Sequence, residues 1–470
     1  METASPTLAG PAADLARAHA LFLQRRDADA LPHARAAALA LPQRADARTL
    51  LGIVLQRLGH ARDAEAAYRA ALRLDAHYAD AWTNLGNLLR DDGDLPGALH
   101  AFKNAMRCSP ASPEPAYNLG VALERFGLHD GALAAFEAAI ECDPAHADAH
   151  WNSALGLLRA GRFAEGFREY EWRFRRGDIA PRDGAQPAWD GRDLEGRPIL
   201  VWAEQGFGDA LQFLRFVPEV ARRGGRVVLE VMDGLQGLAS RLPGVAAVTV
   251  HGAEPPAVDT HVALMSLPHV LGLAPAPASA PYLRACETRR AQWQARLCAH
   301  GHAPGRELAI GLAWAGNPAL RNSRERSPGF AAVRGLLDVP GVRAFSLQKG
   351  AGRADLAHAA LPPNFIDLDA EIADFDDTAA AITQLDLVVT CDTAVAHLAG
   401  ALGKPVFVLL PHTPDWRYGL DPHASPWYPT MQLFRQVKPG DWTEVLARVS
   451  HALAQAVASL PSQPLAAAHA

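Results

Sequence analysis

The chain has 470 residues, of which 49% are hydrophobic and 20% are charged, with a formal net charge of −6. This composition is typical of a folded protein of about three domains, and it lacks the basic excess that binding to nucleic-acid phosphates requires. No apolar run reaches the length of a signal peptide or a membrane span, so we expect a cytoplasmic protein with no membrane span and no nucleic-acid partner.

The first third of the chain is a repeat array. Residues 47–148 contain three segments of 34 residues that align without gaps. Three classes of residue recur in register: turn glycines (Gly59, Gly93, Gly127, Gly161), aromatics (Tyr68, Phe102, Phe136, Tyr170) and small residues (Ala64, Ala98, Ala132, Gly166). Glycine frees the turn between two helices, small residues let the helices approach, and we expect each aromatic to fill the gap towards the next pair.

These repeats resemble the tetratricopeptide (TPR) family, whose W-x2-LG-type positions are present as Trp82 to Gly86 and as Tyr117 to Gly120. The resemblance predicts an α-solenoid over residues 13–176, with a degenerate first repeat that lacks the turn glycine and a partial last repeat. It also implies that the concave face binds a protein or glycan acceptor. Trp172 and Phe174 are interpreted as packing residues against the next domain. Residues 1–12 are predicted to be a disordered N-terminus.

Residues 177–198 are dense in Gly, Pro and Asp, which indicates a linker. Two series of alternating strand and helix patterns follow, over residues 199–290 and 305–455. They predict two Rossmann-like α/β halves, the first of them shortened, whose ligands bind beyond the carboxyl ends of the strands. The aromatic segment 411–436 is interpreted as a loop that packs between the halves or forms a stacking platform. Residues 456–470 are predicted to be a disordered tail.

The segment 392–397, Asp-Thr-Ala-Val-Ala-His, follows a predicted strand and begins a helix. We expect Thr393 to cap this helix and the amides of Ala394, Val395 and Ala396 to point unpaired into the ligand crevice, which suits a diphosphate. His397, one turn further, has a side chain that donates to a phosphate oxygen in this hypothesis. The alternative is a capped core helix with a satisfied histidine.

Further candidates follow the ends of other predicted strands. They are Gln205, Gly206, Gly208 and Asp209 in the first half, and Asn317, Arg326, Gln348 and Lys349 in the second. A carboxylate at Asp209 suits the deprotonation of an acceptor hydroxyl, or simply complements the helix dipole. Cations beyond strand ends suit a diphosphate, or are solvated loop charges. The five cysteines have no metal-ligand or disulfide spacing, so neither a metal site nor a cofactor is expected.

Together these motifs resemble GT-B glycosyltransferases of the heptosyltransferase-like family, in the subset with a TPR array. The residues that carry the resemblance are Gly208-Asp209 with Pro218, Trp314 to Asn317 with Arg326-Ser327, Ser346 to Gly350, and Asp392 to Ala399 with Gly403 to Pro405. The resemblance implies Asp209 as catalytic base, Arg326 at the diphosphate, Asp392 at the donor sugar, and Thr393 to His397 as the phosphate site.

The resulting hypothesis is an inverting, metal-independent glycosyltransferase. It moves a sugar from a nucleotide-diphosphate sugar to a protein or glycan acceptor that the repeats recruit. One rival is a non-catalytic TPR scaffold with a degenerate glycosyltransferase domain. A second rival, a nicotinamide-dependent oxidoreductase, is disfavoured because Leu211 stands at the third glycine position of a dinucleotide fingerprint.

Overall fold

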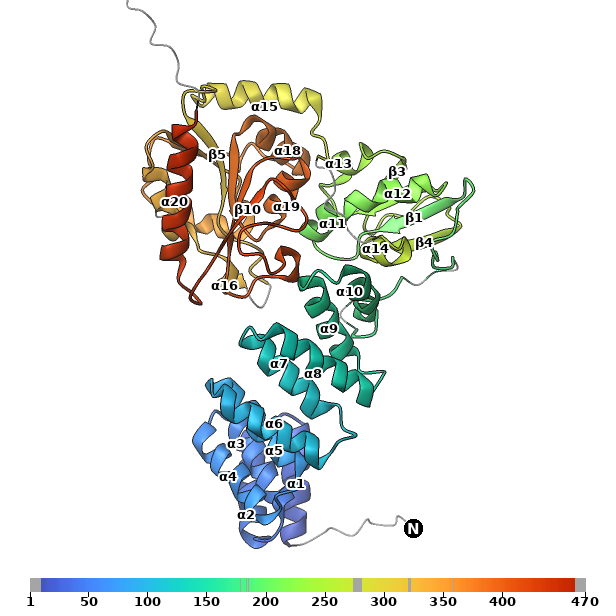
Figure 1. The fold of residues 1–470 in the computed structure, drawn as a ribbon, viewed down its shortest axis with the longest axis vertical. Helices are drawn as coiled ribbons and strands as arrows, with labels where there is room; N and C mark the ends of the chain where they lie inside the picture. The colour runs from blue at the N-terminus through green and yellow to red at the C-terminus, as the bar shows by residue number, and fades with distance from the viewer. Residues whose placement is uncertain are drawn as a thin grey trace, which may run out of the picture. The chain divides into compact units, whose positions relative to one another are not determined.

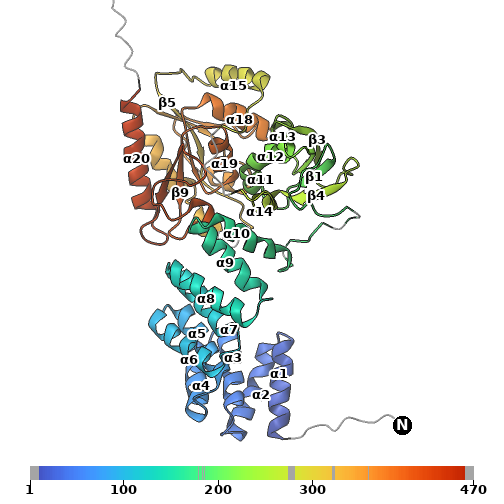
Figure 2. The ribbon, with the colours of Figure 1, turned by 45° about the vertical axis from the view of Figure 1, so that its right-hand side comes forward.

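The computed structural model describes residues 10–177, 179–182, 184, 186–273, 281–319, 323–357 and 359–460. The chain divides into two compact units, Met1–Gly156 and Leu157–Ala470. Figure 1 labels the elements of each unit and Figure 2 shows them from a second side. No helix among the described residues is both long and apolar enough to cross a bilayer.

The first unit is a helical solenoid. Its helices are α1 (Pro11–Leu23), α2 (Asp27–Ala40), α3 (Ala45–Arg57), α4 (Ala61–Leu74), α5 (Ala79–Asp92), α6 (Leu95–Cys108), α7 (Glu114–Arg125), α8 (His129–Cys142) and the start of α9 (Ala147–Arg159). Consecutive helices pack as the pairs α1–α2, α3–α4, α5–α6 and α7–α8.

Each repeat is held by an aromatic ring that packs on a glycine of its own first helix. A Cβ added to Gly86 would lie 2.6 Å from the Phe102 ring, and one added to Gly120 would lie 2.5 Å from Phe136. The rings therefore fill space within their own repeat, in addition to any role towards the next pair. The predicted turn glycines all have left-handed backbone angles, and Arg25 (φ 61°) takes the same conformation in the degenerate first repeat.

The second unit begins with α10 (Phe163–Tyr170) and the 3-10 helix η1 (Glu171–Phe174), and then forms a four-stranded sheet. Its strands and helices are β1 (Pro198–Trp202), α11 (Phe207–Phe213), η2 (Leu214–Phe216), α12 (Val217–Arg222), β2 (Arg226–Val231), α13 (Gln236–Ser240), β3 (Val245–Val250), β4 (Thr260–Ala263), η3 (Leu264–Ser266) and α14 (Leu267–Val270). All neighbours pair in parallel, in the order β3-β2-β1-β4.

A second parallel sheet has six strands in the order β10-β9-β8-β5-β6-β7. Its elements, with the helix before it, are α15 (Glu287–Ala299), β5 (Leu308–Ala313), α16 (Ser323–Arg326), α17 (Phe330–Val333), η4 (Arg334–Asp338), β6 (Val342–Ser346), η5 (Gly350–Leu356), β7 (Phe365–Asp367), α18 (Phe375–Gln384), β8 (Leu387–Cys391), α19 (Ala394–Ala401), β9 (Val406–Leu410), η6 (Trp416–Tyr418), β10 (Met431–Arg435) and α20 (Trp442–Ala458). In both views α20 covers one face of this sheet, and α18 and α19 cover the other.

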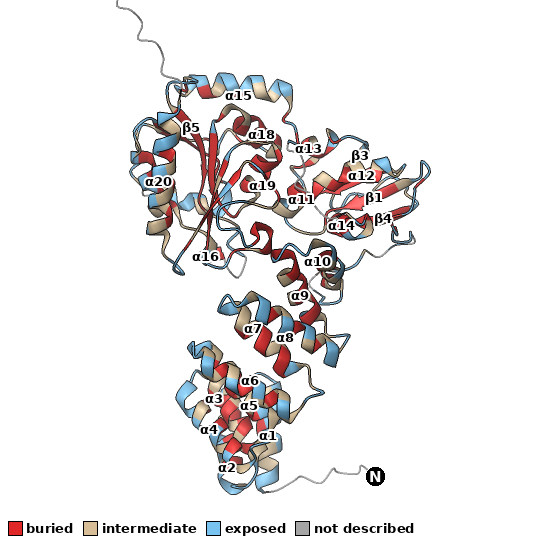
Figure 3. Ribbon diagram, in the orientation of Figure 1, coloured by how far each residue is buried: buried red, intermediate tan, exposed pale blue. Residues whose placement is uncertain are grey.

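The strands of both sheets are mostly buried, as the red strands in Figure 3 show, except β3 at the edge of the first sheet, which is only partly buried. Strands buried on both faces give the continuous apolar runs that the sequence shows at 308–313 and 387–391. The predicted fold class, a TPR solenoid followed by two Rossmann-like halves, is confirmed, and the first half has four strands against six in the second.

The prediction for one segment is wrong in part. Residues 411–436 were expected to form a loop, but Met431–Arg435 forms β10, an edge strand beside β9. The prolines and aromatics before it conceal a strand of only five residues. The predicted disordered ends lie mostly outside the described residues, although α1 begins at Pro11 and α20 ends at Ala458. The linker at 177–198 stays a prediction as a domain boundary.

Candidate functional site

The candidate site lies where the strand order of the second sheet reverses. The chain winds from β5 through β6 to β7 on one side, and from β8 through β9 to β10 on the other, so β5 and β8 are the central neighbours. Their carboxyl ends lead to Gly316 and Asp392, which approach each other: a Cβ on Gly316 would lie 3.6 Å from the Asp392 carbonyl oxygen. Ligands of open α/β sheets bind at this reversal.

Helix α19 begins at this edge with Thr393 as its N-cap. The Thr393 hydroxyl bonds to the Thr390 hydroxyl at 2.9 Å instead of capping the helix. The Ala396 amide donates to the Thr393 carbonyl at 3.0 Å, so the prediction that this amide is unpaired is wrong. In the described part of the chain, nothing accepts from the Ala394 and Val395 amides, and both residues are partly exposed. Two donors at a helix N-terminus remain for an anion.

Asp392 lies in a network of polar contacts directly before this helix. The Tyr418 hydroxyl donates to its Oδ1 at 2.8 Å, and the Arg326 guanidinium lies 3.5 Å from its Oδ2. Burial raises the pKa of Asp392, while Arg326 opposes that rise. The carboxylate is therefore oriented by protein groups, and its predicted contact with a donor sugar stays a prediction.

Arg326, the last residue of α16, joins the loop after β5 to the end of β8. Its Nη2 donates to the Asp392 carbonyl at 2.7 Å. Its buried Nε has no partner among the described residues. The guanidinium thus places a positive charge one residue from the α19 N-cap, as expected for a cation that meets a diphosphate.

Asp209 lies at the start of α11, in the first half of the unit. Its Oδ2 accepts from the Gly206 amide at 3.0 Å, and its Oδ1 accepts from Arg417. Helix α19 lies very close to α11: a Cβ added to Gly208 would lie 3.0 Å from the His397 side chain and 3.7 Å from the Ala394 backbone. The N-termini of α11 and α19 are therefore adjacent, which brings the predicted base beside the predicted diphosphate site.

Arg417 was missed in the sequence. It lies in the loop after β9, where its guanidinium bonds to Asp209 and, at 2.7 Å, to Asp415. Burial disfavours its charge, but the two carboxylates outweigh burial and raise the pKa of Arg417 well above its ordinary value. The alternation of Asp415 and Arg417 around Trp416 was the available signal, although the partner Asp209 is far away in the sequence.

His397 is buried behind the first turn of α19. Its Nδ1 lies 3.1 Å from the Tyr428 hydroxyl, and its other edge faces Gly208. Burial, assisted by the nearby charge of Arg417, lowers the pKa of His397 to about 3. The imidazole is therefore neutral near pH 7, and any contact with a phosphate is made by one N–H and not by a positive charge.

The remaining predicted residues support loops near the site. The side-chain oxygen Oε1 of Gln348 accepts from the backbone amides of Trp314 and Ala315 at 2.9 Å, which fixes the loop after β5. The side-chain Nε2 of Gln205 donates to the Tyr170 hydroxyl at 3.0 Å. The side-chain oxygen Oδ1 of Asn317 accepts from the Ala319 backbone amide at 3.0 Å, within its own turn.

The Lys349 side chain bonds to the loop after β7 and not to the residues of the candidate site. Its ammonium donates to the carbonyls of Asp369 at 2.8 Å and Ile372 at 3.0 Å, and it pairs with the Asp369 carboxylate. The structure therefore brings together Asp209, Arg326, Asp392 and the start of α19, and holds Lys349 against the loop after β7. Within the described residues, no group of three or more His, Cys, Asp or Glu side chains is arranged to hold a metal ion.

Two protein families match the chain. Residues 49–113 and 117–183 match the tetratricopeptide repeat, and residues 348–438 match glycosyltransferase family 9 (heptosyltransferase). The second match includes Asp392 to His397 and Arg417, while Asp209 and Arg326 lie outside it. The chain therefore contains segments that match TPR repeats and glycosyltransferase family 9, as the motifs predicted.

Individual relatives were also found. Protein FlbA of Caulobacter vibrioides is 31% identical over 336 residues, which cover 64% of this chain and 54% of that protein. The chain thus spans about half the length of this relative. A solved structure of Pseudomonas aeruginosa pilF is 19% identical (46% of this chain, 86% of that chain, TM-score 0.36). TTC0263, a TPR protein of Thermus thermophilus, is 21% identical (37% and 93%, TM-score 0.32).

Proposed function

We propose that this protein transfers a sugar from a nucleotide-diphosphate sugar to a protein or glycan acceptor that the TPR repeats recruit. The transfer inverts the anomeric carbon and uses no metal. One observation carries the proposal: the first two amides of α19 are without protein acceptors in the described part of the chain, at the reversal point of a parallel sheet, beside Arg326 and next to Asp209.

In this mechanism the α19 N-terminus and Arg326 bind the diphosphate of the donor. Asp209 takes the proton from the acceptor hydroxyl, and the oxygen attacks the anomeric carbon from the face opposite the diphosphate. The bond between that carbon and the diphosphate oxygen breaks, and the leaving group carries away the electron pair. The helix dipole, the two amides and Arg326 stabilise the charge that develops there.

Arg417 orients the Asp209 carboxylate before the reaction. It holds Oδ1, while the Gly206 amide holds Oδ2 at 3.0 Å, so the carboxylate has a fixed direction. A base positioned in this way avoids the entropic cost of finding its geometry during the reaction.

The experiment is the Asp209→Asn variant, tested by release of nucleoside diphosphate with an acceptor found by intact-mass screening. We expect turnover to fall about 10²- to 10⁴-fold, the usual contribution of a general base, with unchanged donor affinity. The control is Asp190→Asn, an exposed linker acid whose side chain is 57% accessible, which should keep full turnover. Full turnover in Asp209→Asn would remove this residue as the base.

The alternative function that a structural observation favours is a non-catalytic scaffold. It is favoured by the contacts that Arg417 and Tyr418 already make with Asp209 and Asp392. These contacts occupy one oxygen of each carboxylate, as a purely structural network would. The scaffold predicts that no nucleotide-diphosphate sugar binds at all, whereas the transferase requires binding.

A further inference from the structure

Helix α10 stands in the sequence where the last repeat has its second helix, but the packing rule of the repeats changes there. In each complete repeat an aromatic ring packs on a glycine of the first helix, and a Cβ on Gly52 would lie 2.5 Å from the Tyr68 ring. The last repeat has Ala154 at the position of that glycine and Tyr170 at the position of the aromatic. Because a methyl group takes the space that the ring needs, Tyr170 has to pack differently from its counterparts.

The Tyr170 hydroxyl bonds to the turn that leads into α11. Gln205 Nε2 donates to the hydroxyl oxygen at 3.0 Å, and the hydroxyl donates to Gln205 Oε1 at 3.3 Å. Gln205 directly precedes Gly206, whose amide donates to Asp209. Tyr170 is 1% exposed, and burial raises its pKa to about 12, so the hydroxyl stays protonated at neutral pH. The hydroxyl is therefore a fixed bonding partner of the turn that carries Asp209.

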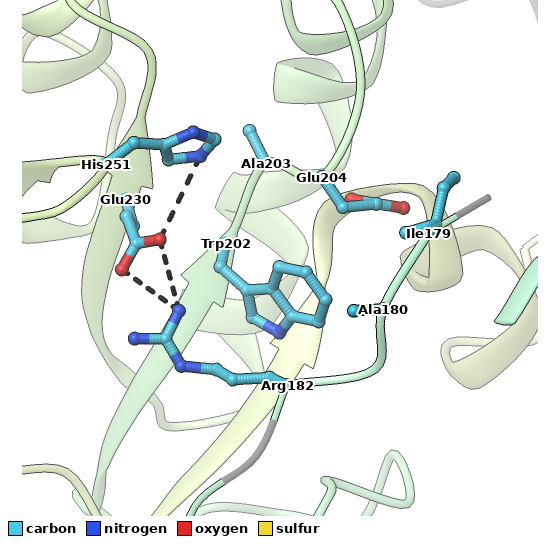
Figure 4. A pocket seen from close by; sticks show the side chains of 8 residues that line it. All are labelled: Ile179, Ala180, Arg182, Trp202, Ala203, Glu204, Glu230 and His251. Atoms are coloured by element: carbon cyan, nitrogen blue, oxygen red, sulfur yellow. Dashed lines mark hydrogen bonds and ion pairs between the residues drawn. The ribbon is translucent and has the colours of Figure 1, made fainter. Parts of the chain in front are cut away.

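A buried ion pair holds the other end of the same turn. Arg173 of η1 bonds through Nη2 to Glu204, shortly after β1, at 2.9 Å, and both side chains are 1% exposed. The same Nη2 donates to the Ser266 hydroxyl at 2.7 Å. Figure 4 shows Glu204 beside a cavity of about 370 Å³, with its carboxylate on the opposite side of Trp202 from Glu230. Since separating a buried ion pair leaves a charge without compensation, η1 fixes Glu204 in place.

The Phe167 ring of α10 contacts both α/β halves of the second unit. Its centroid lies 5.8 Å from that of Phe213 in α11 and 6.0 Å from that of Trp416 in η6. Helix α11 carries Asp209 in its first turn, and Arg417 directly follows Trp416. The buried Phe167 ring therefore packs on the two elements whose side chains form the contact between Asp209 and Arg417. Close packing of this kind limits the movement of α11 relative to η6.

We infer that α10 and η1 position Asp209 for the reaction, with Tyr170 as a positioning residue that acts through Gln205. The hydroxyl of Tyr170 orders the turn at residues 204–209, and the ring of Phe167 keeps α11 against η6. The carboxylate then keeps the direction that its bond to Arg417 sets. The effect on catalysis rests on the proposed function, whereas the ordering of the turn does not. A helix of the repeat type thus belongs to the machinery around the base.

The test compares Tyr170→Phe with Tyr68→Phe in the full chain. Both substitutions remove a hydroxyl that bonds to a glutamine, since Tyr68 donates to Gln56 at 2.8 Å in the first unit. We expect Tyr170→Phe to lower kcat about ten-fold with an unchanged KM for the donor, because a displacement of about 1 Å is costly to a reacting group. Tyr68→Phe should keep full turnover. Gln205→Leu should match Tyr170→Phe, and the double variant should lose no more than either, because both remove the same bond.

Hydrogen exchange with mass spectrometry gives a second readout that needs no turnover. We expect the amides of residues 204–210 to exchange about five-fold faster in Tyr170→Phe, as the loss of one hydrogen bond predicts, and at the wild-type rate in Tyr68→Phe. Unchanged exchange in β5 and β8 shows that the variants are folded.

Two results would overturn the inference. One is wild-type exchange at residues 204–210 in Tyr170→Phe, and the other is a normal kcat of that variant where the wild type is active. Absence of any transfer by the wild type is instead a failure of the proposed function, and the exchange rates of the turn then decide the positioning role by themselves.

Discussion

At the residue scale, the network around Asp209 depends on contacts between distant parts of the sequence. The segment 392–397 was predictable because a strand, a threonine at the N-cap position and a short helix follow one another directly, although the threonine hydroxyl does not cap the helix. The alternation of Asp415 and Arg417 could have marked Arg417 as a candidate, but its contact with Asp209 was not predictable, because Asp209 lies 208 residues earlier in the sequence. The ion pair between Lys349 and Asp369 was also not predictable, because the two residues are separated in the sequence.

The buried, neutral His397 makes a prediction about pH. Its folded pKa is about 3, against about 6.5 when exposed, so between these values the unfolded chain binds a proton that the folded chain does not. This contribution to stability is present above pH 6.5 and is lost as the pH falls. We expect wild-type protein to lose about 2 kcal/mol more than His397→Gln between pH 7 and 5. Urea unfolding at both pH values measures this, and equal losses would show that His397 is charged in the folded state.

At the element scale, the repeat pattern was readable because each repeat presents the same packing requirement at the same position. The glycines that face Tyr68, Phe102 and Phe136 have no room for a methyl group, and they recur with the period of the aromatics. Strand β10 was missed because its alternation spans only five residues behind a run of prolines and aromatics. Short edge strands give weak sequence signals, since their neighbours in the sheet decide them.

The first repeat offers a test of turn chemistry. Arg25 holds a left-handed conformation (φ 61°) at the position where later repeats have glycine, such as Gly59 (φ 81°). A non-glycine residue there costs about 1 to 2 kcal/mol, so Arg25→Gly should raise the opening free energy of α1 and α2 by about 1 kcal/mol. Hydrogen exchange of these helices measures it. The converse variant, Gly59→Arg, should lower the opening free energy of α3 and α4, and faster exchange in Arg25→Gly would contradict the account.

At the scale of the whole molecule, the two α/β halves of the second unit meet through specific contacts at more than one place. Besides Arg417 with Asp209, Arg241 of the first half binds Asp376 of the second, and the Phe207 and Phe375 rings lie 4.9 Å apart. The alternation of strands and helices predicted both halves. It did not predict their contacts, because side chains that pair between separate sheets leave no local periodicity.

The central claim is that the α19 N-terminus binds the diphosphate of a nucleotide sugar. Isothermal titration calorimetry of the full chain against UDP-, GDP-, ADP- and dTDP-sugars tests it most directly, with Arg326→Ala as the weakened variant and Arg192→Ala as the exposed control. We predict that at least one nucleotide sugar binds, that Arg326→Ala weakens it about ten-fold or more, and that Arg192→Ala leaves it unchanged. Binding by none of them, or equal affinity in Arg326→Ala, would contradict the claim.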